Sequence, residues 1–146
     1  MIGEVRLYFL HLLNKRDYSV GELTNKAMVR KHSGAEIKEA IAQLASDNLV
    51  NDFRYAANLA EVYSGRKGKR YFELKLKQHF FPPSIVQQEV EKFEEFYSPE
   101  AIRRLKEKYK VANFESISYP EKAKILNYLA RQGYSNPNQI YQEISN

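Results

Sequence analysis

The sequence of 146 residues contains no cysteine, which excludes disulfide bonds, cysteine-ligated zinc and thiol catalysis. The absence is also typical of the reducing cytoplasm, where we expect this protein to work. Only 6 glycines and 5 prolines are present, so long disordered segments are not expected. No hydrophobic run reaches the roughly 20 apolar residues of a membrane-spanning helix. The first residues also lack the pattern of a secretory signal, and we expect no membrane attachment.

Motifs for catalysis are equally scarce. The three histidines, His11, His32 and His79, are not spaced as metal ligands on one helix. No Walker-type, dinucleotide-binding or nucleophile-elbow glycine pattern occurs, and the pair Gly65 and Gly68 is too close for a phosphate-binding loop. We therefore expect no enzymatic activity, no bound metal and no cofactor.

Charge is sorted into blocks along the chain. The formal net charge is +5, which favours a polyanionic partner. Residues 63–79 hold six cations against one carboxylate, and residues 101–110 hold five against one. Residues 89–100 have the opposite balance, with five carboxylates against one lysine. Each block is consistent either with a solvated helix face or with a binding surface.

Apolar residues recur every three or four positions through most of the chain, which predicts nine helices and no strand. Gly65 and Gly133 are expected to end helices in the left-handed conformation. We expect the first helix over residues 2–15, the second to reach about Arg30, the fifth to span Lys69 to His79, and another to start at Pro120. The predicted helix N-termini are capping boxes at Ser19–Glu22, Ser33–Glu36 and Ser84–Gln87, a cap at Asn51 or Asp52, and cap–proline pairs at Ser98–Pro99 and Asn136–Pro137.

The chain also contains an internal repeat. Three helix–corner–helix segments share an apolar frame, in which the second anchor follows the first by 10 or 11 residues and the third follows by 4. The three frames are Ala27, Ile37 and Ile41; Leu76, Val86 and Val90; and Leu129, Ile140 and Ile144. This period predicts an all-α fold of tandem three-helix repeats stacked into an elongated, curved array. We divide the chain into an N-terminal helix (1–17), two repeats (18–64 and 65–110) and a shortened third repeat (111–146).

Several motifs at these joints resemble the RecX family of bacterial regulatory proteins. The resemblance extends over residues 15–146 and rests on four stretches: Tyr18-Ser19 with Glu22-Leu23 and Lys26; Leu49 to Asp52 with Arg54-Tyr55-Ala56; Gly65 to Gly68 leading into Phe72 and Leu76; and Tyr128 to Tyr134. Four positions depart from the family pattern. Lys31 and Phe80 replace corner glycines, Lys69 replaces a proline, and Phe53 replaces a charged residue.

The resemblance implies a fold of three tandem three-helix repeats and a function. Members of the RecX family bind the filament of the RecA recombinase on single-stranded DNA and lie along its groove. They suppress its ATPase and strand exchange, and thereby modulate DNA repair and the SOS response. On this basis we expect a cytoplasmic, monomeric and non-enzymatic RecA regulator, and whether it also contacts single- or double-stranded DNA directly is open.

The candidate binding residues are the cations of the two basic blocks and of the joint before them. Their expected role is electrostatic contact with acidic filament surface or with DNA phosphates, without base readout. They are Arg54, Arg66, Lys67, Lys69, Arg70, Lys75 and Lys77, with Arg103, Arg104 and Lys106 as a second patch. Asp52 is assigned a structural role as a helix cap.

Two other function classes stay open at this point. The chain could be a stand-alone, sequence-independent nucleic-acid-binding protein, although no unit has a clear recognition helix rich in Arg, Asn or Gln. It could also be a helical scaffold that never meets nucleic acid. Salt-dependent DNA binding without an effect on RecA favours the first, and binding to neither favours the second.

Overall fold

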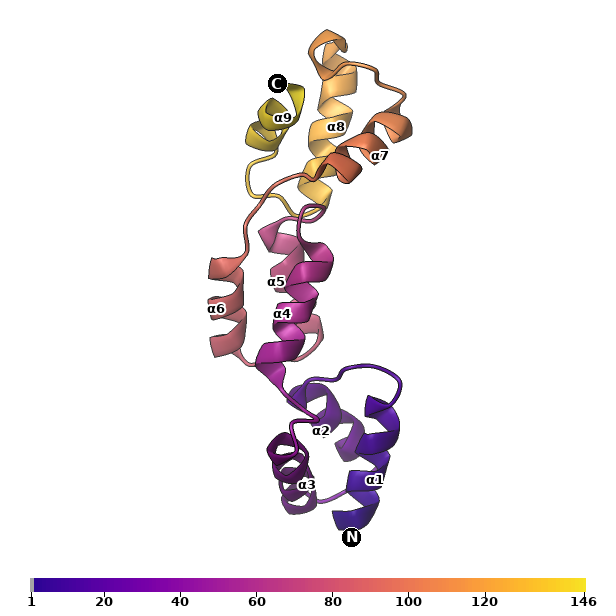
Figure 1. Ribbon diagram of the computed structural model, residues 1–146, viewed down its shortest axis with the longest axis vertical. Helices are drawn as coiled ribbons and strands as arrows, with labels where there is room; N and C mark the ends of the chain where they lie inside the picture. Colours follow the sequence, from indigo (N-terminus) through magenta and orange to yellow (C-terminus); the bar gives the residue numbers. More distant parts are fainter. Residues whose placement is uncertain (1) are drawn as a thin grey trace. The chain divides into compact units, whose positions relative to one another are not determined.

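The computed structural model describes residues 2–146, and for Ile2 the backbone alone; the predicted apolar role of the Ile2 side chain lies outside the described residues. Within this range the chain is all-α, with nine α-helices, one 3-10 turn and no strand, as predicted (Figure 1). The elements are α1 (Ile2–Leu13), α2 (Val20–Val29), α3 (Gly34–Ser46), α4 (Asp52–Tyr63), α5 (Lys69–Gln78), α6 (Pro83–Lys92), α7 (Pro99–Tyr109), the turn η1 (Phe114–Ser116), α8 (Tyr119–Arg131) and α9 (Pro137–Ser145).

Most of the predicted caps are confirmed. Ser19 and Glu22 form the complete capping box of α2, and the side chain of Ser33 accepts the Glu36 amide at the start of α3. Ser98 caps α7 in front of Pro99. Each of these side chains accepts a helix amide that would otherwise have no partner within the helix. Asn136 caps α9 in the same way, in front of Pro137.

Two predicted helix starts are wrong by one residue. The capping box at Ser84 is not formed, because α6 begins at Pro83 and Ser84 is already inside the helix. Proline suits the first helical position, where an amide would lack a partner in any case. The carbonyl of Pro82 accepts the amides of Ile85 and Val86 instead. Likewise, α8 begins at Tyr119 rather than Pro120, with Ser118 as its cap.

The three repeat corners have the same backbone geometry. Lys31, Phe80 and Gly133 each follow the first anchor of their frame by four residues, and their φ angles are 66°, 59° and 90°. In each corner the next amide donates to the carbonyl of the anchor residue: His32 to Ala27 at 3.1 Å, Phe81 to Leu76 at 3.2 Å and Tyr134 to Leu129 at 3.3 Å. This is the bond pattern of a helix ended by a left-handed residue, so the sequence repeat is also a structural repeat.

The chain divides into two compact units. Unit 1 comprises the residues up to Leu59 together with Lys75–Glu89, and unit 2 comprises Ala60–Leu74 together with Val90–Asn146. The boundaries expected from the sequence, an N-terminal helix followed by three repeats, stay a prediction.

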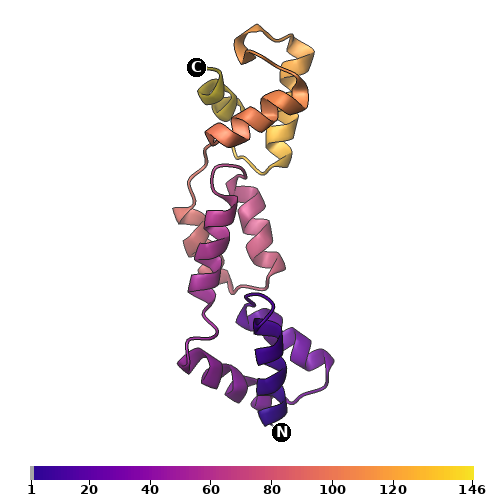
Figure 2. The same cartoon turned by 45° about the vertical axis from the view of Figure 1, so that its right-hand side comes forward.

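In unit 1, α1 packs mainly against α3, and α2 also contacts α3 (Figures 1 and 2). The core of this unit contains the fully buried residues Val5, Phe9, Leu23, Ala27 and Leu44. In unit 2, α8 packs against α9, and η1 also contacts α9. Its core brings together residues of α7, η1, α8 and α9, including Leu105, Phe114, Ile125, Leu129 and Ile140.

The apolar frames occupy equivalent places in these cores. In all three frames the first and second anchors are buried and the third is half-buried. Since the same positions are buried in each repeat, the 3.6-residue periodicity of the sequence correctly identifies the inward faces of these helices. Among the residues that the structure describes, no helix has both the length and the apolar character needed to cross a bilayer.

Candidate functional site

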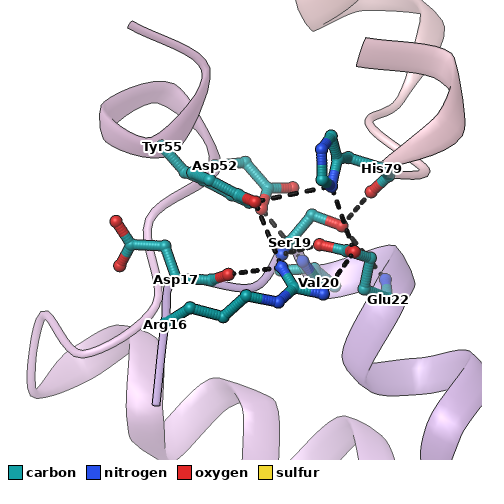
Figure 3. Close-up of polar contacts among 8 residues, drawn as sticks. All are labelled: Arg16, Asp17, Ser19, Val20, Glu22, Asp52, Tyr55 and His79. Carbon is teal, nitrogen blue, oxygen red and sulfur yellow. Dashed lines mark hydrogen bonds and ion pairs between the residues drawn. The ribbon is translucent and has the colours of Figure 1, made fainter. Parts of the chain in front are cut away.

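The start of α2 forms a polar joint in unit 1 (Figure 3). The hydroxyl of Ser19 donates to the carbonyl of His79, in the corner that follows α5. The amide of Val20 donates to Asp52 Oδ1 at 2.9 Å, whereas α4 itself is capped by Asn51, whose Oδ1 accepts the Arg54 amide at 3.1 Å. Asp52 is therefore structural, as predicted, but it caps a helix other than its own.

Glu22 lies at the centre of this joint. Its carboxylate accepts from the Ser19 amide at 3.0 Å and from the Arg16 guanidinium at 3.1 Å, and it lies 3.1 Å from His79 Nδ1 (Figure 3). A carboxylate only accepts hydrogen bonds, so Nδ1 of His79 carries the proton. Burial alone would raise the pKa of Glu22, but these hydrogen bonds outweigh it and hold the pKa below its ordinary value. Tyr55 closes the cluster, since its hydroxyl accepts from Arg16 at 3.2 Å.

Unit 2 contains a second joint of the same design at the start of α5. The amide of Gly68 donates to the carbonyl of Gln132 at 2.9 Å, and the amide of Arg70 donates to that of Gly133 at 3.0 Å. The carboxylate of Glu95 accepts the Lys69 amide at 2.9 Å, as Asp52 accepts the Val20 amide in unit 1. In both joints, a corner carbonyl and a distant carboxylate therefore fix the N-terminus of a helix.

Glycine makes the close approach in unit 2 possible. A Cβ on Gly68 would lie 2.3 Å from the Tyr134 amide nitrogen and 2.4 Å from the Gly133 carbonyl carbon. A Cβ on Gly133 would lie 2.3 Å from the Tyr71 amide nitrogen. These distances are to backbone atoms, which cannot move aside without shifting a helix or a corner. The hinge from Gly65 to Gly68 is thus held against the corner before α9.

Four of the candidate cations surround this second joint. Arg66 and Arg70 are exposed, and Arg66 Nε donates to the Val62 carbonyl at 2.8 Å. Lys67 is half-buried; its Nζ donates to Gln132 Oε1 and lies 4.5 Å from the centre of the Tyr71 ring. Lys69 is half-buried as well. The sequence block therefore contains two kinds of cation, exposed arginines and lysines that are partly covered by the joint.

The candidates in unit 1 are Arg54, Lys75 and Lys77. Arg54 is half-buried and donates to the Asn48 carbonyl at 3.1 Å, so part of its role is to fix the turn before α4. Lys77 is exposed and Lys75 is half-buried, both in the last turns of α5. Cations there interact favourably with the C-terminal end of the helix dipole.

The predicted second patch lies on α7 in unit 2. Arg103 pairs with Glu107 at 3.2 Å and Arg104 pairs with Glu100 at 2.9 Å, and both pairs are exposed. Exposed pairs of this kind contribute little, about 0–1 kcal/mol each, so a polyanion can displace the carboxylates at small cost. Lys106 is half-buried, and its Nζ lies 5.5 Å from the centre of the Phe114 ring.

Comparison with known proteins places this geometry in a family. No protein-family model matches the chain. A curated relative, Regulatory protein RecX of Actinobacillus pleuropneumoniae serotype 5b, is 34% identical over 88 residues, or 60% of this chain. The chain spans 58% of the length of that relative. Regulatory protein RecX of Vibrio parahaemolyticus is 27% identical over 129 residues, which cover 86% of this chain and 81% of the relative.

Solved structures agree with these relatives. A crystal structure of RecX from Lactobacillus salivarius matches with a TM-score of 0.78 and 22% identity, over 98% of this chain and 93% of that one. A second crystal structure, of a regulatory protein RecX, matches with a TM-score of 0.70 and 17% identity, over 98% of this chain and 72% of that one. The chain belongs to the RecX family. The structural matches show that its fold is the RecX helical-repeat fold.

The departures from the RecX pattern can now be located in the structure. Lys31 and Phe80, where the family usually has glycine, adopt the left-handed conformation of a corner glycine. Lys69, in place of the usual proline, supplies the amide that Glu95 accepts, a hydrogen bond that proline could not make. Phe53 is exposed on α4.

Sequence reasoning missed a group of aromatic residues beside the second patch. The rings of Tyr109 on α7 and Tyr128 on α8 lie 5.9 Å apart at 76°, with Lys108 and Arg131 near them. The available signal was the adjacency of cations and tyrosines in Lys108-Tyr109 and in Tyr128 to Arg131. We had assigned Tyr109 to an apolar stripe and Tyr128 to a corner motif. Neither assignment indicated that the two tyrosines meet. Within the described residues, no cluster of His, Asp and Glu is suited to hold a metal ion.

Proposed function

We propose that this chain binds the RecA filament on single-stranded DNA in the cytoplasm and inhibits the ATPase and strand exchange of RecA. The inhibition is by binding alone, without catalysis, and regulates DNA repair and the SOS response. Membership of the RecX family supports a regulatory role, since the curated relatives are named regulatory proteins. RecA as the partner follows from the motif resemblance of the joints.

The observation that carries the proposal is the basic joint of unit 2, defined here as Arg66, Lys67, Lys69 and Arg70. Its backbone is fixed by hydrogen bonds to Gln132 and Gly133 and by the carboxylate of Glu95. A fixed backbone lets cations meet a repetitive anionic surface with little ordering cost. Both an acidic protein groove and a DNA backbone offer such a surface.

The structure divides the roles within the basic joint. The exposed side chains of Arg66 and Arg70 are positioned for contact with the filament. Lys67 contacts Gln132 and the Tyr71 ring, so its replacement would also disturb the joint itself. The informative variant is therefore Arg66→Ala with Arg70→Ala, which leaves the contacts of Lys67 in place.

The test is inhibition of RecA by that double variant. We expect the concentration for half-maximal inhibition of the DNA-dependent ATPase to rise about fivefold, because each exposed charge contact contributes up to about 1 kcal/mol. The matched control is Lys15→Ala with Lys38→Ala, which removes two exposed charges from unit 1. Circular dichroism should show unchanged helix content in both. Full inhibition by the arginine variant would refute the site assignment.

The second candidate is a stand-alone, sequence-independent nucleic-acid-binding protein. It is favoured by the cation–aromatic contacts in unit 2, such as Lys67 near Tyr71. Its distinguishing result is salt-dependent DNA binding combined with an unchanged RecA ATPase.

A further inference from the structure

The pair of helices α7 and α8 carries a concentration of positive charge in unit 2. Residues 99–131 hold eight Lys and Arg residues against four Glu residues. The two helices lie side by side in both views (Figures 1 and 2), and Tyr109 and Tyr128 join them through an edge-to-face contact. The joint described above contributes no residue to this group, so α7 and α8 form a separate surface.

Two cations flank the tyrosine pair. Lys108 Nζ lies 5.2 Å from the centre of the Tyr128 ring and 5.9 Å from that of Tyr109. The guanidinium carbon of Arg131 lies 6.0 Å from the Tyr128 ring. Lys108 and Arg131 are exposed, whereas both tyrosines are half-buried. We call Lys108, Tyr109, Tyr128 and Arg131 the α7–α8 face.

We propose that the α7–α8 face binds single-stranded DNA, with an unpaired base stacked on Tyr128 and the flanking phosphates held by Lys108 and Arg131. This proposal deepens the proposed function by adding a direct contact with the strand. It also holds for the free protein, so it is tested without RecA.

Magnitudes favour an exchange of the internal contacts for the ligand. An exposed cation–ring contact contributes about 0.5–1 kcal/mol. Stacking of a base on an aromatic side chain contributes about 1–3 kcal/mol, and each cation released from a ring gains a phosphate and frees a counterion. The internal contacts therefore hold the tyrosines and cations in place until the strand arrives, without competing strongly with it.

The same chemistry selects a single strand over a duplex. A base in a duplex is stacked on its neighbours, and a half-buried ring on a helix face cannot reach it without disrupting the pair. An acidic protein surface would use Lys108 and Arg131 but would gain little from the ring between them. The tyrosines are therefore the feature that distinguishes the ligands.

The experiment is fluorescence polarisation with a labelled oligothymidylate, in the absence of RecA. Tyr128→Leu keeps an apolar side chain but removes the ring, and we expect Kd to rise by about fivefold to 100-fold. Tyr128→Phe keeps the ring and should change Kd by less than about twofold. Lys108→Ala with Arg131→Ala should lower the slope of log affinity against log salt by about 1.4, from about 0.7 for each lost phosphate contact.

The charge-matched control is again Lys15→Ala with Lys38→Ala, which should leave the slope nearly unchanged. Equal affinity of Tyr128→Leu and wild type, or equal affinity for duplex and single strand, would overturn the proposal. So would variants that bind DNA normally but no longer inhibit RecA, since the face would then contact protein. If Tyr128→Leu loses helicity, the salt slope of the doubly substituted cation variant decides alone. Failure of RecA inhibition in the wild type would overturn the proposed function but not this site.

Discussion

Two carboxylates at the start of α2 have opposite relations to pH. Hydrogen bonds to Glu22 lower its pKa in the fold despite burial. Burial raises the pKa of Asp52, which accepts only the Val20 amide and also faces the charge of Glu22. The same joint therefore contains one carboxylate that gains stability from ionisation and one that loses it.

We predict that Glu22→Gln and Asp52→Asn change the acid stability of the protein in opposite directions. Because folding lowers the Glu22 pKa, its ionisation stabilises the fold above its ordinary pKa of 4.5, and this contribution is lost as pH falls through the folded value. Because folding raises the Asp52 pKa above 3.8, its charge is destabilising, and this penalty disappears as pH falls through the raised value.

The measurement is the urea midpoint of each variant between about pH 7 and about pH 3. Glu22→Gln should lose less stability than wild type on acidification, and Asp52→Asn should lose more. Both replacements keep a side-chain oxygen that can accept the existing hydrogen bonds. An acid-side slope for Glu22→Gln equal to that of wild type would contradict the account of this joint.

Individual residues also show where sequence reasoning reaches its limit. Gly65 and Gly133 were predicted to be left-handed, and both are. Lys31, Asn48, Phe80 and Lys110 are left-handed too, although the conformation costs a residue with a side chain about 1–2 kcal/mol. Only the long-range packing of each corner over-determines these backbones. No local pattern in the sequence could have indicated them.

At the scale of elements, the joint at the start of α5 depends on the absence of a side chain at Gly68. Its neighbours at 2.3–2.4 Å from an added Cβ are backbone atoms of Gly133 and Tyr134. We predict that Gly68→Ala lowers the free energy of unfolding by about 3 kcal/mol, the upper range for overpacking. Urea denaturation measures this directly.

Gly34 provides the matched control for that substitution. It is the first residue of α3, and an added Cβ would meet nothing within 4 Å. Gly34→Ala should therefore stabilise the protein by about 0.5 kcal/mol, because it restricts only the unfolded chain. A loss for Gly68→Ala no larger than the change for Gly34→Ala would show that the two backbones do not approach as described.

Helix existence and inward faces were predictable from the sequence because burial follows the 3.6-residue period. Local capping chemistry was predictable in most cases as well. The failure at Ser84 arose because Pro82 and Pro83 were both treated as corner residues, although one proline of the pair could start the helix. The partners of the capping carboxylates were not predictable. Asp52 and Glu95 cap helices more than 25 residues away in the chain.

For the whole molecule, the repeat and the RecX family could be identified from the sequence because both depend on spacing. Which cations are available for binding could not. Arg66, Lys67 and Arg70 belong to one charge block, yet only the two arginines are exposed. The contacts of Lys67 with Gln132 and Tyr71 arise from the fold. The tyrosines of the α7–α8 face were likewise brought together by packing between helices.

The most direct test of regulation is the rate of ATP hydrolysis by RecA on single-stranded DNA, titrated with the wild-type chain. An inhibitor that acts along a filament affects many RecA subunits for each molecule bound. We therefore expect the rate to fall at ratios well below one chain per RecA monomer. An unchanged rate in stoichiometric excess of protein whose helicity is intact would contradict the proposed function.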